Sequence, residues 1–367
     1  MSKCEICGGL LKPLEFATDV ALTSDYRILR RDLSHDFCVN CGAVKVADGS
    51  SINARMFYRG YQLLHEETEC SIITAEGAVE QGKYLVDFIS PYLTRLSVGS
   101  LLDVGCGKGD FLYYLHEHFP NLALYGVEPS ESFEMLSKRL VKINKFKGFF
   151  EDSPFVGEQF DIITLIEVLE HVDNPREFLS LIRKCMHNDT VLLVDVPNFD
   201  NNKTDLLVVD HKWKFTEGSL SNIFNLSGLR VIEKEVSKGV PMRYLAVKDV
   251  ERRVEKMDVN PYIQKSTSYI ERVVEQWKAG DIIHKEIFVY GLGLIYLFLK
   301  AKGFVKPENV VAFVDDNPSY WKLRLDGKPV IPPHDMSKYP CKTVFLAMND
   351  CYHEKVLSKL KGYKVIR

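Results

Sequence analysis

The chain has 367 residues, a length that predicts two or three domains. Its hydrophobic fraction of 46% and charged fraction of 26% are ordinary for globular proteins, which excludes disordered, collagen-like and mucin-like chains. Forty-seven basic and 50 acidic residues leave a net charge of −3. Since proteins that bind nucleic acid through its phosphates are usually basic, this charge disfavours a nucleic-acid partner and favours a small-molecule partner.

Neither a secretory signal nor a membrane span is expected. The N-terminal segment begins Met1-Ser2-Lys3-Cys4 and lacks the apolar core of a signal peptide. The longest strongly apolar run is 287–299, which is 13 residues, whereas a helix needs about 20 to cross a bilayer. We therefore expect a cytoplasmic protein. In the cytoplasm thiols stay reduced, and cysteine pairs more often bind metal than each other. A monomer or homodimer is expected.

Residues 1–54 are predicted to form a zinc-binding module, because four of the nine cysteines fall within them. Cys4 and Cys7 form one Cys-x-x-Cys pair and Cys38 and Cys41 form another, and a glycine follows each pair. Four thiolates suit one tetrahedral, structural Zn²⁺ ion with no open position. The alternatives are two unrelated thiol pairs or a redox dithiol. Five other cysteines show no such spacing and are expected to be ordinary buried or partly buried residues: Cys70, Cys106, Cys185, Cys341 and Cys351.

Residues 55–96 are predicted to be a helical connecting segment that covers the substrate. Aromatic residues recur there at helical spacing, namely Phe57, Tyr58, Tyr61, Tyr84, Phe88 and Tyr92. Packing in a core is the alternative to substrate contact for these side chains.

Residues 97–248 alternate short apolar runs with longer amphipathic stretches. Strands are predicted at 100–104, 123–128, 160–166 and 190–196, and helices at 109–118, 131–140 and 175–186. This alternation predicts a parallel sheet with helices on both faces.

The first predicted strand of this domain runs into a glycine-rich turn formed by Gly105, Gly107 and Gly109, and a helix follows at once. Glycines let a backbone approach a ligand closely, and a helix N-terminus favours a negatively charged group such as a carboxylate. The Gly-x-Gly-x-Gly spacing departs from the dinucleotide fingerprint, which argues against NAD here. Glu128 ends the next strand 21 residues after Gly107, where this kind of fold places an acid on ribose hydroxyls.

Residues 249–367 are predicted to form a smaller α/β domain after a charged stretch at 248–256. Strands are expected at 287–290, 310–314 and 343–347, and helices at 293–302 and 353–360. The overall fold class is therefore α/β, with a central Rossmann-like domain, a small N-terminal zinc-binding module and a smaller C-terminal Rossmann-like domain.

A second glycine pair, Gly291 and Gly293, begins a Rossmann-like turn in the C-terminal domain. Tyr296 stands where a dinucleotide fingerprint has its third glycine, while Asp315 lies 22 residues past Gly293, so spacing alone leaves an NAD site open. We favour a domain that grips the nucleotide or head group of the acceptor, and a domain that keeps the fold without binding a nucleotide is the alternative.

The segment 160–172, followed by Pro175, makes residues 100–230 resemble the class I S-adenosylmethionine (SAM)-dependent methyltransferases. The resemblance implies that the glycines of 105–109 cradle the methionine part of SAM. It further implies that Asp103 supports the loop or the SAM ammonium group and that Glu128 holds the ribose. The remaining residues that the resemblance assigns to the cofactor are Phe150 and Glu151 at the adenine, and Ile166 and Glu167 near the transferred methyl group.

Glu167, Glu170 and His171 form a Glu-x-x-Glu-His string. Some quinone O-methyltransferases carry a similar string and use it for a divalent cation. Helix capping and packing is the alternative, which we prefer because short motifs often occur by chance.

The whole arrangement resembles the sugar C-methyltransferases, which methylate nucleotide-linked keto-deoxysugars. That family has a Tyr-x-Glu-His sequence, with the histidine as catalytic base, followed by an aromatic residue and Ser-Leu. In this chain His211 matches the base, Asp210 replaces the glutamate and Val208 replaces the tyrosine. Segments 314–318 and 347–350 are similar to the family's nucleotide-sugar domain.

A carbon beside a ketone becomes a nucleophile only when its proton is removed and an enolate forms. His211 is expected to take that proton, with Asp210 orienting its ring, and Tyr58 or Tyr61 to hydrogen-bond the enolate oxygen. The predicted function is thus SAM-dependent methylation of a carbon in a sugar nucleotide. Alternatives are an O- or N-methyltransferase for another small molecule, an RNA methyltransferase, and a non-catalytic zinc scaffold.

Overall fold

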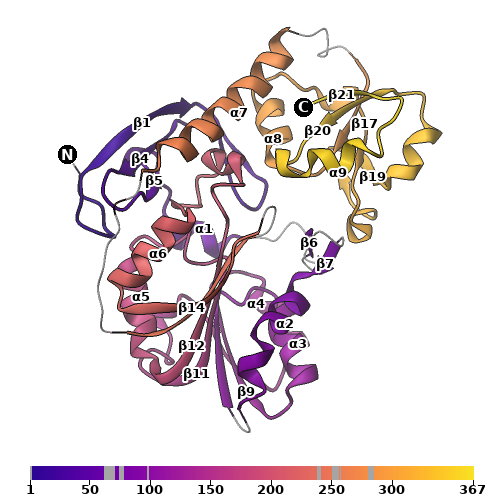
Figure 1. Ribbon diagram of the computed structural model, residues 1–367. Coiled ribbons are helices and arrows are strands. Elements are labelled where there is room, and N and C mark those ends of the chain that lie inside the picture. The colour runs from indigo at the N-terminus through magenta and orange to yellow at the C-terminus, as the bar shows by residue number, and fades with distance from the viewer. Residues whose placement is uncertain are drawn as a thin grey trace. The chain divides into compact units, whose positions relative to one another are not determined.

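A computed structural model describes residues 2–61, 71–73, 78–96, 99–237, 241–249, 256, 258–279 and 285–367. The chain divides into two compact units (Figure 1). Unit 1 contains residues 1–14, 35–198 and 210–259, and unit 2 contains residues 15–34, 199–209 and 260–367. Unit 1 therefore includes the cysteine pairs together with the glycine-rich turn, while the four predicted domain boundaries remain predictions. Among the described residues, no helix is long and apolar enough to span a membrane.

The main sheet of unit 1 has seven strands in the order β10-β9-β8-β11-β12-β15-β14. Its first five strands are parallel and follow the 3-2-1-4-5 order of a doubly wound sheet, and β15 is antiparallel to both neighbours. The strands are β8 (Gly99–Val104), β9 (Leu122–Glu128), β10 (Asn144–Lys147), β11 (Phe160–Ile166), β12 (Met186–Val196), β14 (Leu229–Glu235) and β15 (Met242–Lys248). The predicted parallel α/β domain is confirmed, and β10, β14 and β15 are additions to the predicted strands.

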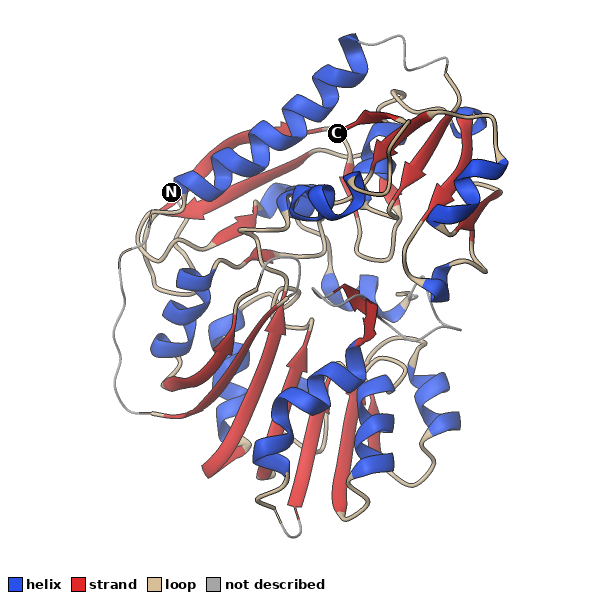
Figure 2. Cartoon of the chain, turned by 45° about the vertical axis from the view of Figure 1, so that its right-hand side comes forward, coloured by secondary structure: helices blue, strands red, loops and turns tan. Residues whose placement is uncertain are grey.

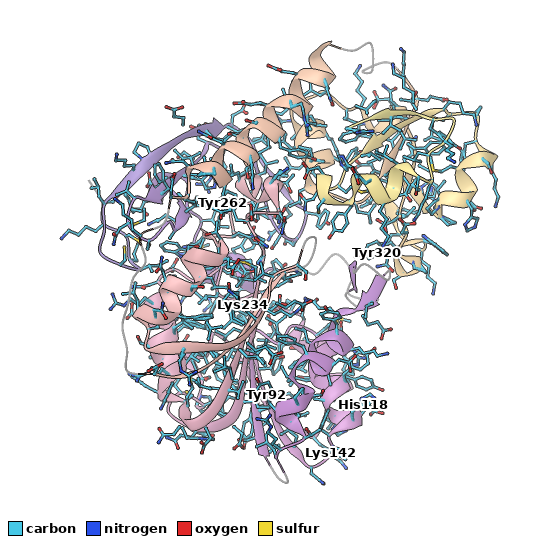
Figure 3. The ribbon with its side chains drawn as sticks, viewed as in Figure 1. Tyr92, His118, Lys142, Lys234, Tyr262 and Tyr320 are labelled. Carbon is cyan, nitrogen blue, oxygen red and sulfur yellow. The ribbon has the colours of Figure 1, made fainter. Side chains whose placement is uncertain are left out.

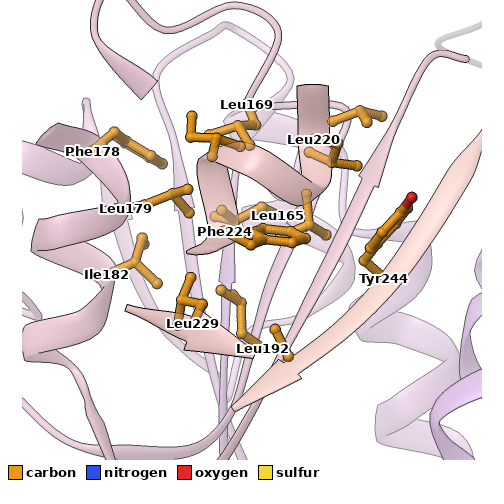
Figure 4. Packing of buried hydrophobic residues seen from close by; sticks show 14 of the residues in the cluster. Leu165, Leu169, Phe178, Leu179, Ile182, Leu192, Leu220, Phe224, Leu229 and Tyr244 are labelled. Carbon is orange, nitrogen blue, oxygen red and sulfur yellow. The ribbon is translucent and has the colours of Figure 1, made fainter. Parts of the chain in front are cut away.

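Helices cover both faces of this sheet (Figure 2). They are α2 (Gln81–Leu93), α3 (Asp110–His118), α4 (Phe133–Arg139), α5 (Pro175–Lys184) and α6 (Glu217–Leu226). Successive strand residues enter opposite cores, because side chains alternate along a strand: Leu101 packs in the core with Phe111 of α3, and Leu102 in the core with Phe178 of α5. Figure 4 shows α5 and α6 packing on the second of these cores.

Local sequence signals set the ends of the helices that flank the site. The Asn174 side chain accepts a hydrogen bond from the Glu177 backbone N–H, and Pro175 opens α5 at the first helical position. Thr216 and Ser219 form a reciprocal capping box that starts α6. Tyr92 of α2, labelled in Figure 3, donates to Glu233 of β14 at 3.0 Å.

A four-stranded sheet in the order β1-β4-β5-β13 carries the cysteine pairs. Its strands are β1 (Leu11–Thr18), β4 (Leu33–Cys38), β5 (Val44–Val46) and β13 (Trp213–Lys214), and a 3-10 helix η1 (Asp48–Ser50) and helix α1 (Ala54–Arg59) follow β5. β13 comes from the segment just after His211 and pairs antiparallel with β5. The cysteine-bearing segment is thus joined by backbone hydrogen bonds to the segment that holds the predicted base.

The prediction of a helical segment over 55–96 is only partly right. Helices α1 and α2 lie in this range, but a short antiparallel pair, β6 (Ser71–Ile73) and β7 (Ala78–Glu80), stands between them. The β-branched residues Ile72, Ile73 and Val79 favour extended backbone, and this local preference overrides the aromatic spacing. Residues 62–70 and 74–77 lie outside the described residues.

Unit 2 has a second doubly wound sheet, in the order β18-β19-β17-β16-β20-β21, all parallel except β18. The strands are β16 (Ile287–Tyr290), β17 (Val310–Val314), β18 (Arg324–Leu325), β19 (Lys328–Ile331), β20 (Thr343–Leu346) and β21 (Lys364–Ile366). Helices α7 (Asn260–Ala279), α8 (Leu294–Ala301) and α9 (His353–Leu357), the short pair β2 (Ala21–Leu22) and β3 (Ile28–Leu29), and 3-10 helix η3 (Lys203–Leu207) complete the unit's main elements. The predicted smaller Rossmann-like fold is confirmed.

Candidate active site

The glycine-rich turn follows β8 and opens α3. Gly105, Gly107 and Gly109 all have positive φ angles, of 78°, 53° and 82°. A Cβ atom at Gly105 would lie 2.4 Å from Val168, and one at Gly109 would lie 2.4 Å from Leu136. The positive φ angles therefore favour glycine at all three positions, and at Gly105 and Gly109 the chain's own side chains already fill the space that a Cβ atom would need.

Asp103 and Glu128 lie at the carboxyl ends of the neighbouring strands β8 and β9. Thr164 donates to Asp103 Oδ1 at 2.7 Å, and burial raises the pKa of Asp103 to about 7. The two carboxylate oxygens of Glu128 accept from the backbone N–H groups of Gly107 and Ser130, each at 2.8 Å. Burial raises the pKa of Glu128 above its ordinary value. The predicted ribose ligand thus also braces the glycine-rich turn.

The predicted adenine residues lie in and beside the 3-10 helix η2 (Phe150–Asp152). Phe150 is buried and its ring packs edge-to-face on Phe178, with 5.9 Å between ring centroids. Phe149 is half-buried, with the Arg55 guanidinium 4.7 Å above its ring, and Glu151 is exposed. This burial favours Phe149 over Phe150 for the predicted stacking on adenine.

The predicted methyl-group residues, Ile166 and Glu167, end β11. Ile166 is half-buried, and Glu167 is exposed with a left-handed φ of 53°. The Glu167 backbone N–H donates to the Asp195 carbonyl at 2.8 Å, which fixes this turn to β12. The surrounding protein raises the pKa of Glu167 by desolvation, while His211 and Arg243 oppose the shift. A non-glycine residue in this conformation is strained, as is common where a side chain is aimed at a ligand.

The side chains expected to take part in proton transfer lie close together in a polar cluster. The Tyr58 hydroxyl lies 2.5 Å from His171 Nδ1 and donates to Asp210 Oδ2 at 3.3 Å. His171 Nδ1 also lies 3.0 Å from the Asp210 carbonyl oxygen. Burial and the Asp210 carboxylate raise the pKa of Tyr58 well above its ordinary value, so its hydroxyl keeps its proton and acts as a donor. We call Tyr58, His171, Asp210 and His211 the proton-transfer cluster.

His211 completes this cluster. Its ring packs edge-to-face on that of His171, with 4.9 Å between centroids. One ligand atom each from Glu170, His171 and His211 lie within 4.8 Å of one another, a group that can share protons or hold a cation. Glu167 is not a member of that group, although it belongs to the Glu-x-x-Glu-His string. The Tyr61 ring packs on the Tyr58 ring, with 5.4 Å between centroids.

The cluster forms because three distant segments are fixed to one another. Asn53 accepts from the Met56 backbone N–H and starts α1, which carries Tyr58. The Trp213 backbone N–H donates to the Glu170 carbonyl at 3.0 Å and its indole N–H to the Val172 carbonyl at 3.0 Å. The loop after β11 and the segment around His211 are therefore held side by side.

The four N-terminal cysteines converge as predicted. Sγ of Cys4 lies 3.7 Å from Sγ of Cys41, and Sγ of Cys7 lies 3.4 Å from Sγ of Cys38. A tetrahedral zinc with Zn–S bonds of about 2.3 Å separates its sulfur ligands by about 3.8 Å, so the four thiols fit that ion. Three of the other cysteines are buried and one is half-buried, namely Cys106, Cys185, Cys341 and Cys351, and Cys70 lies outside the described residues.

In the turn that follows β16 of unit 2, packing within the chain itself requires a glycine at position 293. A Cβ atom at Gly293 would lie 1.9 Å from the Ala347 carbonyl oxygen, so the close approach there is to the chain itself. Tyr296 packs on Phe313, 5.0 Å between ring centroids, and donates to Asp326 at 2.6 Å. Asp315 ends β17 beside the turn and accepts from the Asn317 backbone N–H at 2.8 Å.

Two features of this site were not predicted from the sequence. His171 was assigned to capping and packing, but it lies at the centre of the cluster. Arg243 of β15 is fully buried and pairs with Asp195 at 2.7 Å and Glu235 at 3.0 Å. No motif marks Arg243, and the only sequence signal for His171 was the Glu-His pair itself.

A family model described as a methyltransferase domain matches residues 79–234, a range that contains the glycine-rich turn, Glu128, His171 and His211. The tRNA U34 carboxymethyltransferase of Campylobacter lari is 24% identical over 152 residues, which are 39% of this chain and 50% of that protein. The chain thus spans about half the length of this relative.

A second relative covers more of both chains. An uncharacterized protein of Methanocaldococcus jannaschii is 30% identical over 188 residues, which are 51% of this chain and 72% of that protein. Among solved structures, an S-adenosylmethionine-dependent methyltransferase from Clostridium acetobutylicum aligns with 46% of this chain and 91% of its own, with 11% identity and a TM-score of 0.39.

Proposed function

Since the chain belongs to the class I SAM-dependent methyltransferases, we propose that it methylates a carbon beside the ketone of a nucleotide-linked keto sugar. The observation that carries this proposal is the proton-transfer cluster. It combines an imidazole base, His211, with a hydroxyl that stays protonated, Tyr58, close to the end of β11. Removal of a proton next to a ketone requires a base at the carbon and a donor at the oxygen.

SAM supplies the activated methyl group when it is bound. In this proposal the bare backbone of Gly105, Gly107 and Gly109 receives its methionine part. The Asp103 carboxylate faces the ammonium group, and Glu128 binds the ribose hydroxyls. Phe149 and Glu151 meet the adenine, in place of the buried Phe150, and Ile166 and Glu167 flank the sulfonium.

The chain's own chemistry is a proton transfer. His211 takes the proton from the acceptor carbon, and the electron pair of that C–H bond passes to the ketone oxygen as an enolate. Tyr58 donates a hydrogen bond to this oxygen. The enolate carbon then forms a bond to the methyl carbon as the methyl–sulfur bond breaks, and His211 returns its proton to water.

Asp210 has a supporting role in this scheme. Its carboxylate accepts from Tyr58 and lies 3.9 Å from His171 Nδ1, so it holds the two donors in place. The sequence resemblance has a tyrosine at the position of Val208, and Val208 is fully buried. Tyr58 supplies a phenol to this cluster from a different segment.

We also propose a structural Zn²⁺ on Cys4, Cys7, Cys38 and Cys41, and a nucleotide-binding role for unit 2. The zinc proposal is supported by the spacing of the four sulfurs and by the absence of an open ligand position. The unit 2 proposal is supported by Asp315 at the carboxyl end of a doubly wound sheet, where such sheets bind ligands.

Deuterium wash-out tests the proposed proton transfer directly. A nucleotide-linked keto-deoxysugar, incubated in D₂O with protein and S-adenosylhomocysteine, exchanges its α-hydrogen if His211 removes it. We expect exchange with the wild type and none above background with His211→Ala. Exchange at an unchanged rate in His211→Ala would mean that another group is the base, and transfer without exchange would favour an O- or N-methyltransferase.

A further inference from the structure

We propose that Glu170 is the positioning residue for His211: its buried carboxylate balances the positive charge that His211 acquires on taking a proton. This inference rests on the proposed role of His211 as base. It gives a role to a residue that the sequence assigned to capping and packing.

Within the described ranges, the Glu170 carboxylate is buried without a hydrogen-bond partner, which is unusual for a charged group. It is 1% exposed, and neither carboxylate oxygen has a hydrogen-bond partner among the described residues. A buried, ionised carboxylate without hydrogen bonds is expensive unless a positive charge lies close to it. The nearest candidates are the two imidazoles of His171 and His211, whose nitrogen atoms lie within 4.8 Å of it.

The two histidines meet Glu170 in different ways. His171 directs Nδ1 at the Asp210 carbonyl and at Tyr58, and its Nε2 lies 3.8 Å from Glu170 Oε1, too far for a hydrogen bond. Burial raises the pKa of Glu170 well above its ordinary value, and the Glu167 and Asp195 carboxylates raise it further, whereas a positive charge on His211, within 4.8 Å, opposes that rise. Glu170 and His211 thus stabilise each other only when both are charged.

The backbone holds this pair in place. The Glu170 carbonyl accepts from the Trp213 N–H, two residues after His211, and the His171 N–H donates to the Val168 carbonyl at 3.0 Å. The carboxylate therefore needs little reorganisation when a proton arrives at His211, which is the condition for electrostatic preorganisation.

Other titratable and charged groups also lie around the pair. They are Glu167 and His171 on the same loop, Asp195 on β12, Tyr58 on α1, and Asp210 and Lys214 on the segment of His211. Asp195 is paired with Arg243, and the Asp210 carboxylate lies against Tyr58 and His171. The buried Glu170 carboxylate has neither a hydrogen bond nor an arginine partner in the described part of the chain.

The test is a titration of the histidines by NMR, which needs no acceptor. Protein labelled with ¹³C,¹⁵N-histidine is titrated from pH 5 to 9, and the His211 signal is assigned by its loss in His211→Asn. In Glu170→Gln we expect the pKa of His211 to fall by about one to two units, since a charge about 4–5 Å away is lost. Glu158→Gln, an exposed carboxylate before β11, is the matched control and leaves the titration unchanged.

Glu170→Asp keeps the negative charge and provides a second variant in case Glu170→Gln fails to fold. The pKa of His211 in Glu170→Asp should lie closer to its wild-type value than to its value in Glu170→Gln. An identical His211 pKa in wild type and Glu170→Gln would overturn the proposal. A cation site would also overturn it. If one equivalent of Mn²⁺ broadened the signals of His171 and His211 in the wild type but not in Glu170→Gln, then Glu170, His171 and His211 would bind a cation instead. If wash-out fails in the wild type but the pKa shift is observed, only the proposed function is lost.

Discussion

The backbone N–H of Trp213 donates a hydrogen bond to the carbonyl oxygen of Glu170 over 3.0 Å. Trp213 also belongs to β13, and it pairs with Lys45 of β5 in the sheet that carries the cysteine pairs. One residue thus connects the cysteine-bearing sheet to the loop that carries Glu170 and His171. The cysteine-bearing sheet is therefore joined to the scaffold of the candidate active site.

Loss of the proposed zinc should disturb catalysis more than SAM binding. In Cys38→Ser/Cys41→Ser we expect no zinc by elemental analysis, a melting temperature lower by at least about 5 °C, and little change in SAM affinity. The reason is that β5 and β13 support His211, whereas the glycine-rich turn is fixed by β8 and β9. Cys351→Ser, at a half-buried cysteine outside the four-thiol group, is the control. An unchanged zinc content and melting temperature would contradict the four-thiolate site.

Glu128→Gln should weaken SAM binding about tenfold to hundredfold, as measured by calorimetry. The substitution weakens hydrogen bonds from the ribose hydroxyls to a charged group and the brace on the Gly107 N–H. Glu131→Gln, three residues further on and exposed, should bind SAM like the wild type. Equal affinity in Glu128→Gln and wild type would remove Glu128 from the cofactor site.

Asp103 makes the stability of the protein without SAM depend on pH. Its folded-state pKa of about 7 lies above the ordinary 3.8, so its contribution to stability is fully present below pH 4 and is lost as pH rises through 7. By pH 8 ionisation of this carboxyl should destabilise the wild type by on the order of 2–4 kcal/mol. Asp103→Asn lacks this penalty. The free energy of unfolding in urea should therefore rise in Asp103→Asn relative to the wild type between pH 5 and pH 8. A constant stability difference across that range would be inconsistent with this account.

Tyr58→Phe should slow methyl transfer about tenfold to a thousandfold while SAM affinity stays the same, because a donor to the developing oxyanion is removed. Tyr92→Phe is the matched control, since the Tyr92 hydroxyl donates to Glu233 of β14 instead. Initial rates with [methyl-¹⁴C]SAM compare the two variants. Equal rates in both would assign Tyr58 to packing, which is the alternative that the sequence left open.

The cofactor half of the site could be read from the sequence because its residues lie in short contiguous motifs. The turn from Gly105 to Gly109 and the acid at the end of the next strand are set by local backbone geometry. Phe149 and Phe150 could not be distinguished in this way, since which of two adjacent rings enters the core depends on the fit to Phe178 in three dimensions.

The proton-transfer cluster could be predicted only in part. Tyr58 and His171 are 113 residues apart, and their contact depends on α1 and on the pairing of β13 with β5. Two-residue strands such as β13 leave no periodic pattern to detect. Strands β6 and β7 show the same limit, because their extended backbone was hidden by aromatic residues that recur at helical spacing on either side.

The position of the transferred methyl group tests the central claim most directly. Protein, [methyl-¹³C]SAM and a nucleotide-linked keto-deoxysugar are incubated together, and the product is examined by ¹³C NMR. The account predicts a methyl signal in the region of methyl groups bonded to carbon, well upfield of O-methyl signals, and its absence with His211→Ala. A signal near 55–60 ppm, which marks a methyl on oxygen, or transfer that is independent of His211, would contradict it.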